Sequence, residues 1–270
     1  MKWSSRILLS MLIILVGGLV SSNMILKKVY DKLDKGDIYW TFVKVSEQPF
    51  KYLKVEGGNI TNIAFEQNAH CSFRILNEWN RFHNDFVKVF VKSDTLFVKF
   101  IYTIKNLDEK FWMQRMTLVR IFSPELLYVE GRDTKMEMFK LKQKSISLNM
   151  SGKSSFEIES MERNLDSICV IQKDSSEVVI EMSPEFNGIE PLLPADSRVQ
   201  LNIKGMPPIV NMPLGKTKSK ETMFVGSVTA AIQGNSLLDI GHAQINNLQL
   251  KVADSSGVIL SGGALKKISK

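Results

Sequence analysis

The fold is decided by the stretch SGKSSFEIESMERNLDSICVIQKDSSEVVI, residues 151–180, because a similar phrase returns as GNSLLDIGHAQINNLQLKVADSSGVILSGG, residues 234–263. Each phrase starts with Gly and Ser, runs through an alternating apolar pair and reaches an Asn-Leu step. Each then closes on Asp-Ser-Ser, at residues 174–176 and 254–256. The shared positions hold turn-forming and alternating apolar residues, which indicate backbone geometry rather than a reaction.

The chain after Gly36 alternates apolar and polar residues, a pattern typical of half-buried strands. Gly, Asn, Asp and Ser separate these stretches about every ten residues. Helical spacing is scarce, and its best example, residues 77–86, fits a loop equally well. We therefore predict an all-β body, with its clearest strands at residues 50–57, 85–102, 145–152, 198–203 and 248–260.

The recurrence of the phrase distinguishes between all-β folds. A sandwich or barrel requires no self-similarity, whereas a β-solenoid stacks similar coils in sequence order. The phrase recurs at an offset of about eighty residues, and weaker echoes with Asp-Thr between two strands lie at 91–100 and 129–139. We predict a parallel β-helix whose Asp-Ser and Asp-Thr steps turn the corners, so that like residues stack on neighbouring rungs.

One segment interrupts the pattern at residues 204–222, KGMPPIVNMPLGKTKSKET. Proline cannot donate to a sheet ladder, and closely spaced lysines resist burial. The segment is predicted to be an irregular exposed loop, either a plain linker or a binding element.

The amino terminus contains twenty residues without a charge, ILLSMLIILVGGLVSSNMIL, residues 7–26. That is the ~20 residues that a helix needs to cross the hydrocarbon core. A cleaved signal peptide is the alternative, because GLVSSN offers small residues near a plausible cut. The apolar run continues beyond Ser22, however, which favours an uncleaved anchor with a juxtamembrane helix over 1–36. A linker over 37–49 and the β-domain over 50–270 complete the predicted organisation.

Composition and charge narrow the function. The net charge is +7, but the basic residues are dispersed among acids, which indicates a solvated surface rather than a nucleic-acid site. The flanking charges of the anchor do not decide its orientation. The chain has two cysteines, Cys71 and Cys169, each among apolar residues; free buried thiols are favoured over one long-range disulfide.

Two fragments resemble part of a nucleotide-binding loop: Gly152-Lys153-Ser154 and Gly215-Lys216-Thr217. The phosphate-binding loop also needs a glycine five residues earlier, where these fragments have Ser147 and Val210. We therefore predict no nucleotide site and no other cofactor site.

The remaining candidates for chemistry also lack a complete motif. His70, His83 and His242 lie far apart, and no zinc-ligand spacing or nucleophile elbow is present. Asp174 and Asp254 could serve glycosidic chemistry, but their Ser-Ser neighbours favour turns in which the carboxylate caps the backbone. No catalytic or metal-ligating residue is predicted. Three aromatic residues at strand spacing, Phe97, Phe100 and Tyr102, would form a stacking platform if they faced outward.

Four motifs carry a resemblance to a known family: Gly57-Gly58-Asn59-Ile60, GRDTKMEMFKL (131–141), SGKSSFEIE (151–159) and the repeated Asp-Ser-Ser. Together they resemble the head GIN domain of the putative auto-transporter adhesins of Bacteroidetes, from about residue 50 to the end. The anchor followed by YDKLDKGDIYWTF (30–42) looks like membrane-anchored members of that group. The resemblance implies a right-handed parallel β-helix on the outer side of the cytoplasmic membrane, an adhesive role and no catalytic residues.

The expected protein is therefore a non-enzymatic, single-pass inner-membrane protein with a β-solenoid in the periplasm, or alternatively at the cell surface. It would adhere to or scaffold the envelope, with the membrane bound through residues 7–26 and a glycan or an envelope protein as its ligand. Two alternatives are a membrane-anchored polysaccharide enzyme with carboxylates along one face, and an envelope sensor that signals through the helix at 29–35.

Overall fold

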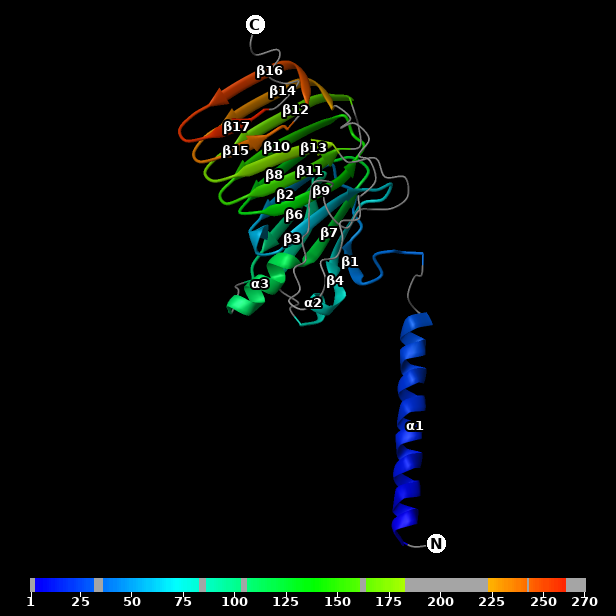
Figure 1. Cartoon of the computed structure of the whole chain (residues 1–270). Coiled ribbons are helices and arrows are strands. Elements are labelled where there is room, and N and C mark those ends of the chain that lie inside the picture. Colours follow the sequence, from blue (N-terminus) through cyan, green and yellow to red (C-terminus); the bar gives the residue numbers. More distant parts are fainter. Residues whose placement is uncertain are drawn as a thin grey trace, which may run out of the picture. The chain divides into compact units, whose positions relative to one another are not determined.

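A computed structural model gives the structure of residues 3–31, 36–82, 86–102, 106–160, 164–182, 223–241 and 243–260 (Figure 1). Its helices are α1 (Trp3–Asp31), α2 (Asn77–Phe82) and α3 (Leu107–Arg115), with a 3₁₀ turn at Gly58–Ile60. The first strands are β1 (Phe42–Ser46), β2 (Tyr52–Glu56), β3 (Asn62–Gln67), β4 (Ser72–Leu76), β5 (Val87–Lys92), β6 (Thr95–Phe100) and β7 (Thr117–Ser123). The others are β8 (Tyr128–Arg132), β9 (Lys135–Leu141), β10 (Ser145–Ser151), β11 (Ser155–Ser160), β12 (Asn164–Gln172), β13 (Glu177–Met182), β14 (Phe224–Ile232), β15 (Leu237–Asp239), β16 (Gln244–Val252) and β17 (Gly257–Ile259).

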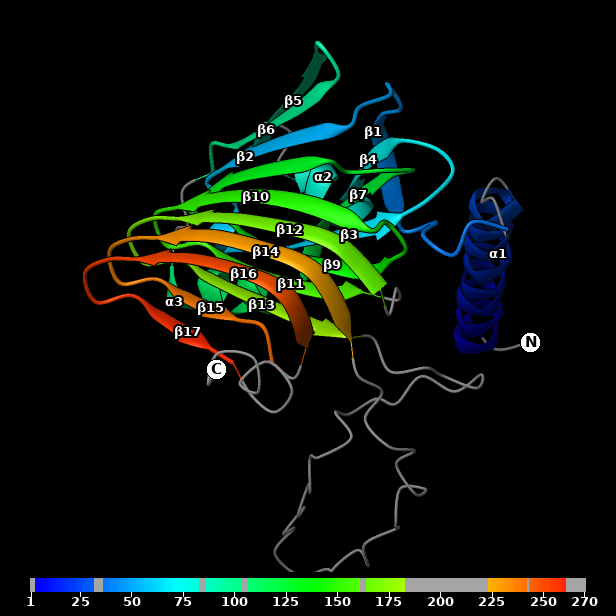
Figure 2. The same cartoon turned by 90° about the horizontal axis from the view of Figure 1, so that it is seen from above.

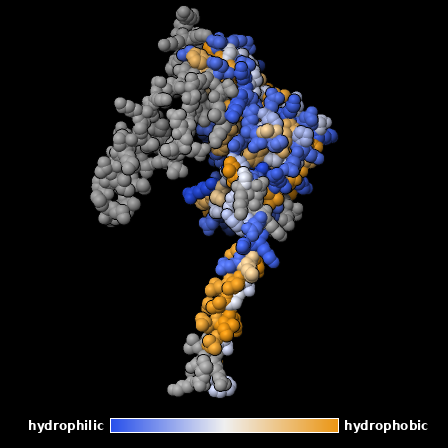
Figure 3. Space-filling model, turned by 90° about the vertical axis from the view of Figure 1, so that its right-hand side faces the viewer, coloured by the Kyte–Doolittle hydropathy of each residue, from blue (hydrophilic) through white to orange (hydrophobic). Residues whose placement is uncertain are grey.

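The first of two compact units, Met1–Val43, contains α1. The span Leu9–Lys28 is long and apolar enough to cross a membrane, and none of it is buried. Figure 3 shows its apolar side chains as a continuous surface. Exposed apolar side chains all around a helix are stable only in an apolar environment, so the helix suits a membrane anchor or a signal sequence.

The second unit, Lys44–Lys270, contains two sheets (Figures 1 and 2). One sheet has nine strands, in the order β1-β4-β7-β3-β9-β11-β13-β15-β17, and the other has eight, in the order β16-β14-β12-β10-β8-β2-β6-β5. From β8 to β17 successive strands alternate between the sheets, and the pairs between neighbours are parallel. The described part of this unit is mostly β, and α2 falls in the segment whose helical spacing was noted. Strand β1 falls within the predicted linker, 37–49.

The prediction of a right-handed parallel β-helix is wrong. Both sheets are mixed, because β4 pairs antiparallel with β7 and β5 pairs antiparallel with β6. Only Ser93 and Asp94 connect β5 to β6, with φ values of 48° and 56°. Two consecutive residues with positive φ match the twist of an antiparallel hairpin, and a two-residue connection cannot join parallel strands. The Asp-Thr step at residue 94 is therefore a hairpin turn, not a corner.

The repeated phrase has a structural explanation in the register of β12, β14 and β16. Leu165 pairs with Val225, and Val225 pairs with Ile245, which are steps of 60 and 20 residues. The offset of about eighty residues thus spans two steps along the sheet. The predicted match of the two Asn-Leu steps is wrong, because Leu248 aligns through Val228 with Ile168. The predicted strand at 198–203 and loop at 204–222 lie outside the described residues.

The Asp-Ser-Ser phrases turn corners between the sheets. Asp174 and Asp254 have φ values of 66° and 59°. The Asp174 carboxylate accepts a hydrogen bond from Gly152 N at 2.9 Å, and the Asp254 carboxylate accepts one from Gly234 N at 3.0 Å. Each aspartate therefore caps the backbone of the neighbouring corner, as its sequence context predicts.

The core lies between the two sheets, where inward side chains of both sheets meet. Strand alternation places apolar residues on this side and polar residues on the other. The fully buried members (0% exposed) include Leu53, Val129, Leu148, Val170 and Val228 from the eight-stranded sheet, and Phe65, Met136, Phe156, Val178 and Leu238 from the nine-stranded sheet.

Replacement of Asp174 tests the corner geometry. Asp174→Ala should lower the free energy of unfolding by about 1–2 kcal/mol. The change removes a hydrogen bond, and alanine adopts a positive φ less readily than glycine, asparagine or aspartate. Asp174→Asn, which keeps an acceptor and tolerates positive φ, should lose less than about 0.5 kcal/mol. Urea unfolding of the full chain in micelles gives these values. Greater destabilisation by Asp174→Gly than by Asp174→Ala would show that the left-handed conformation is not what the corner requires.

Candidate ligand-binding face of the eight-stranded sheet

The outward face of the eight-stranded sheet carries a row of uncharged polar residues. Their neighbours along the strands, such as Leu53, Val129 and Leu148, point into the core and are 0% exposed. The parallel register aligns one outward residue from each of seven adjacent strands, here called the uncharged stripe. Its members are Thr95, Tyr52, Tyr128, Ser147, Cys169, Thr229 and Gln249.

A second uncharged row lies beside the stripe on β10, β12, β14 and β16. Its members in register are Ser145, Ser167, Ser227 and Asn247. The Ser167 hydroxyl donates to the Ser145 hydroxyl at 3.1 Å. These four strands therefore present two adjacent rows of hydroxyl, thiol and amide groups with no formal charge, each hydroxyl able both to donate and to accept.

Tyr128 is oriented by its neighbours. Its hydroxyl accepts a hydrogen bond from Asn149 Nδ2 at 3.1 Å and donates to Glu130 Oε2 at 3.4 Å. Glu130 also forms an ion pair with Lys54 at 2.8 Å, and this hydrogen bond raises the pKa of the Lys54 ammonium group. Both partners are partly exposed, so the pair adds little stability and serves mainly to hold Glu130 beside the tyrosine.

Aromatic residues extend this face toward the β5 edge. Phe90 and Phe97 stack with ring centroids 4.9 Å apart and an interplanar angle of 9°, and Phe90 is 54% exposed. Tyr52, on β2, is 38% exposed. Charged residues flank the stripe. The adjoining outward row contains the Lys54–Glu130 ion pair and Lys251, and the row beyond it contains Lys99, which pairs with Glu56 at 3.0 Å.

The sequence predicted only part of this aromatic surface. Phe97 faces outward as a platform requires, but Phe100 is 8% exposed and belongs to the core. Tyr102 lies in a separate aromatic cluster. Tyr52 and Tyr128 were missed, although alternation in YLKVE and YVEGR places both outward.

The other predicted residues do not converge on a site. Gly152-Lys153-Ser154 forms a corner in which Lys153 N donates to Asp133 Oδ1 at 2.9 Å, which explains the fragment without a phosphate. His70 is exposed, while His83, His242 and Gly215-Lys216-Thr217 lie outside the described residues. Within the described ranges, no group of three His, Cys, Asp or Glu residues could hold a metal ion.

The two cysteines are free and half-buried, less buried than predicted. Cys169 belongs to the uncharged stripe. The Cys71 thiol donates weakly toward Phe50 O at 3.7 Å and Ser123 Oγ at 3.6 Å.

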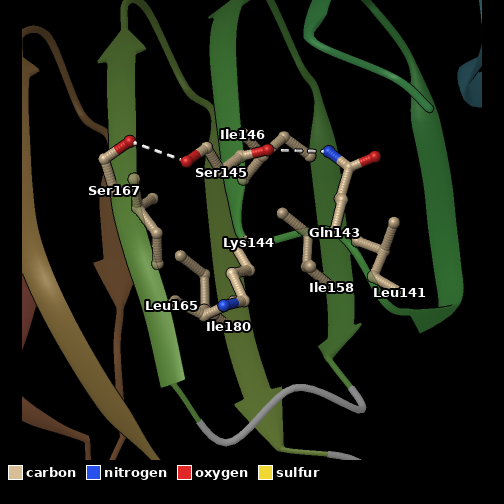
Figure 4. A pocket seen from close by; sticks show the side chains of 10 residues that line it. Leu141, Gln143, Lys144, Ser145, Ile146, Ile158, Leu165, Ser167 and Ile180 are labelled. Carbon is tan, nitrogen blue, oxygen red and sulfur yellow. Dashed lines mark hydrogen bonds between the residues drawn. The ribbon is translucent and has the colours of Figure 1, made fainter.

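Two pockets of the described chain differ from a catalytic cleft, because neither has a pair of carboxylates in its lining. The pocket in Figure 4 lies at the edge of the core, has a volume of about 10 Å³, and is lined by Ile158, Leu165, Ile180 and other residues without a carboxylate. There Gln143 Nε2 donates to Ser145 O at 2.8 Å. A larger open hollow includes one acid, Glu47. The Lys44 ammonium group holds the pKa of the Glu47 carboxyl below its usual value.

An aromatic cluster forms around α2 and α3. Trp79 stacks on Trp112 with centroids 5.4 Å apart and contacts Tyr102 edge-on at 5.5 Å. The Tyr102 hydroxyl donates to Glu109 Oε1, and Glu109 N in turn donates to Asn106 Oδ1 at 2.8 Å, which caps α3. Burial and the Glu109 carboxylate raise the pKa of Tyr102 to about 12.

No protein-family model matches the chain, and no curated protein matches it. Among similar solved structures, one named "putative adhesin" from Bacteroides fragilis NCTC 9343 has 12% identity over 82% of this chain and 96% of its own, with a TM-score of 0.33. A "putative adhesin" from Parabacteroides distasonis ATCC 8503 has 12% identity over 82% of this chain and 94% of its own, with a TM-score of 0.36. A "putative lipid binding protein" from the same organism has 10% identity over 82% and 96%, with a TM-score of 0.30.

The names agree with the adhesins of Bacteroidetes that the sequence resembles, and the head GIN domain itself stays a prediction. Because these TM-scores lie below 0.5, the role of this chain rests on its own residues.

The raised pKa of Tyr102 predicts a late titration. One of the five tyrosines should ionise near pH 12, and the stability that this hydroxyl contributes is complete below about pH 10 and is lost as the pH rises toward 12. Glu109→Gln should lower the pKa of Tyr102, while Asp108→Asn, in the same helical turn, should not. Tyrosinate absorbance of the folded chain measures this, and an unchanged titration in Glu109→Gln would contradict the assigned partner.

Proposed function

We propose that this chain is a non-enzymatic binding protein anchored in the inner membrane by α1, with its β-body on the periplasmic side. Its role is to hold an envelope component against the outward face of the eight-stranded sheet, in adhesion or as a scaffold. The observation that carries the proposal is the uncharged stripe, which stays in register across seven strands and is not part of the core.

The distribution of acids favours binding over catalysis. An enzyme acting on polysaccharide would place two carboxylates around one bond, generally with a cleft that positions the substrate. Glu137 and Glu157 do lie side by side, but on the outward face of the nine-stranded sheet. There Glu137 accepts a hydrogen bond from Asn62 Nδ2. Neither residue lines either of the two pockets described above.

The anchor and its side of the membrane rest on different observations. The length and exposure of the span Leu9–Lys28 support a helix in lipid. The resemblance of the motifs at 57–60, 131–141 and 151–159 to exported head domains supports the periplasmic placement. Exposure on the cell surface is the alternative placement of the same body.

The anchor predicts a specific fractionation. The full-length chain should remain in the membrane after alkaline carbonate washing, because a spanning helix is held by burial of about 20 apolar residues in hydrocarbon. Replacing Leu12 and Leu15 by Arg should release the chain. Intact-mass measurement of the native protein distinguishes an uncleaved anchor from a cleaved signal peptide. A soluble chain that begins beyond Ser22 would identify the signal peptide.

The placement predicts a protease result. A carboxy-terminal tag should resist protease in intact cells and be digested once the outer membrane is permeabilised. Digestion in intact cells would place the body on the surface. Digestion only in lysate would place it in the cytoplasm and overturn the proposed function; a cytoplasmic marker protein serves as the control for lysis.

A further inference from the structure

The absence of formal charge along the uncharged stripe limits the kinds of ligand that can bind to it. Thr95, Tyr52 and Tyr128 are followed by four more positions without a formal charge, and the lysine in register, Lys92, lies on the edge strand β5. An anionic polymer such as nucleic acid would need cations along its path. A protein partner would need a desolvated cluster of large side chains, for which the rows on β10 to β16 offer chiefly serine, threonine and amides. The complementary ligand is neutral and rich in hydroxyl groups.

The spacing of the stripe suits an extended polymer. Neighbouring strands are separated by about 4.8 Å, so seven strands present equivalent polar groups at regular intervals over roughly 29 Å. Each hydroxyl or amide can both donate and accept, as sugar hydroxyls do. A chain of sugar rings laid across the strands would meet a new polar side chain on each strand.

The aromatic residues at one end of the stripe provide the apolar surface that a sugar ring also needs. The C–H face of a sugar ring packs against an aromatic ring, and the exposed part of Tyr52 and the adjacent Tyr128 stand in register at this end. Tyr128 is already held by Asn149 and Glu130, so little side-chain freedom is lost when a ligand binds. The stacked pair of Phe90 and Phe97 lies in the adjoining row.

We propose that the uncharged stripe binds a neutral glycan chain that lies across the strands, with its sugar rings against Tyr52 and Tyr128 and its hydroxyls along Ser147 to Gln249. This inference names the ligand of the proposed binding face and therefore rests on that function. Binding itself can be measured on the purified full chain, whatever side of the membrane the body occupies.

The experiment measures binding of the full chain, in micelles of a detergent without a sugar headgroup, to neutral oligosaccharides of glucose and of N-acetylglucosamine. Affinity should rise with oligomer length and be insensitive to salt, because no charges are paired. Tyr52→Ala and Tyr128→Ala should each weaken binding about tenfold, as expected for loss of one ring contact.

A matched pair of serine variants separates this face from the rest of the body. Ser147 and Ser155 are both half-exposed, outward and near the middle of a sheet, but Ser155 lies on β11 in the nine-stranded sheet. Ser147→Lys should abolish binding because it inserts a long cation into the stripe. Ser155→Lys should leave it unchanged. Thermal unfolding of both variants verifies that each is folded.

Three results would overturn the ligand assignment: no binding of any neutral oligomer, binding that Ser147→Lys leaves intact, or binding confined to anionic glycans and lost in salt. If Ser147→Lys instead abolishes capture of an envelope protein while neutral glycans do not bind, the occupant is a protein. Each of these results, with the tag still in the periplasm, leaves the proposed anchored binding protein in place. A cytoplasmic tag with intact glycan binding would do the reverse.

Discussion

One residue with a positive φ turns the corner after each of the strands β2, β8, β10, β12, β14 and β16. In spatial order these residues are Gly57, Asp133, Gly152, Asp174, Gly234 and Asp254. Glycine and aspartate alternate, and the contacts explain why. A Cβ on Gly152 would lie 2.4 Å from Asp133 Oδ1, and one on Gly234 would lie 2.6 Å from the Asp174 carbonyl oxygen. The aspartate of one corner thus needs the space that a glycine leaves at the next.

The corners determine the register, and the register creates the candidate site. Ser147, Cys169, Thr229 and Gln249 each lie five residues before the positive-φ residue of their corner. A slip of one residue would exchange the outward hydroxyls for the inward Leu148, Val170 and Ala230, at the cost of the core. The alignment of the uncharged stripe is therefore maintained by the same burial that stabilises the fold, and Tyr128 is oriented in addition by Asn149 and Glu130.

The sequence allowed the corners to be predicted but not the order of the strands. Asp-Ser-Ser recurs because both phrases make the same local contact, in which Asp174 accepts from Gly152 N and Asp254 from Gly234 N, the glycines of the neighbouring corners. The Asn-Leu match failed because β12 and β16 each expose two consecutive residues, Asp166-Ser167 and Asn246-Asn247. Asn164-Leu165 precedes this exposed pair on β12, whereas Leu248 follows it on β16, so the two leucines are not in register. The predicted corner at Asp94 became a hairpin because Ser93 also adopts positive φ, a property that serine does not signal.

Most of the candidate site could not be predicted from the sequence, for a related reason. Alternation places Tyr52 and Tyr128 outward, yet 76 positions separate them, and only the pairing of β2 with β8 brings them together. Helix α3 was missed too, although Asn106 followed by Glu109 is a capping signal that the sequence does contain. Local signals were thus readable, while long-range pairing was not.

A binding face formed by outward residues aligned across neighbouring strands differs from a pocket in how it can change over evolution. Each outward position contacts solvent and its two lateral neighbours, so a substitution such as Thr229 to another small polar residue leaves Val228 and Ala230 in the core untouched. Such a surface can change its ligand without a loss of stability, provided that the corner residues stay as they are. Polar variation on the stripe together with constancy at Asp133, Asp174 and Asp254 is the pattern that a binding scaffold requires, whereas an enzyme would hold its outward residues fixed.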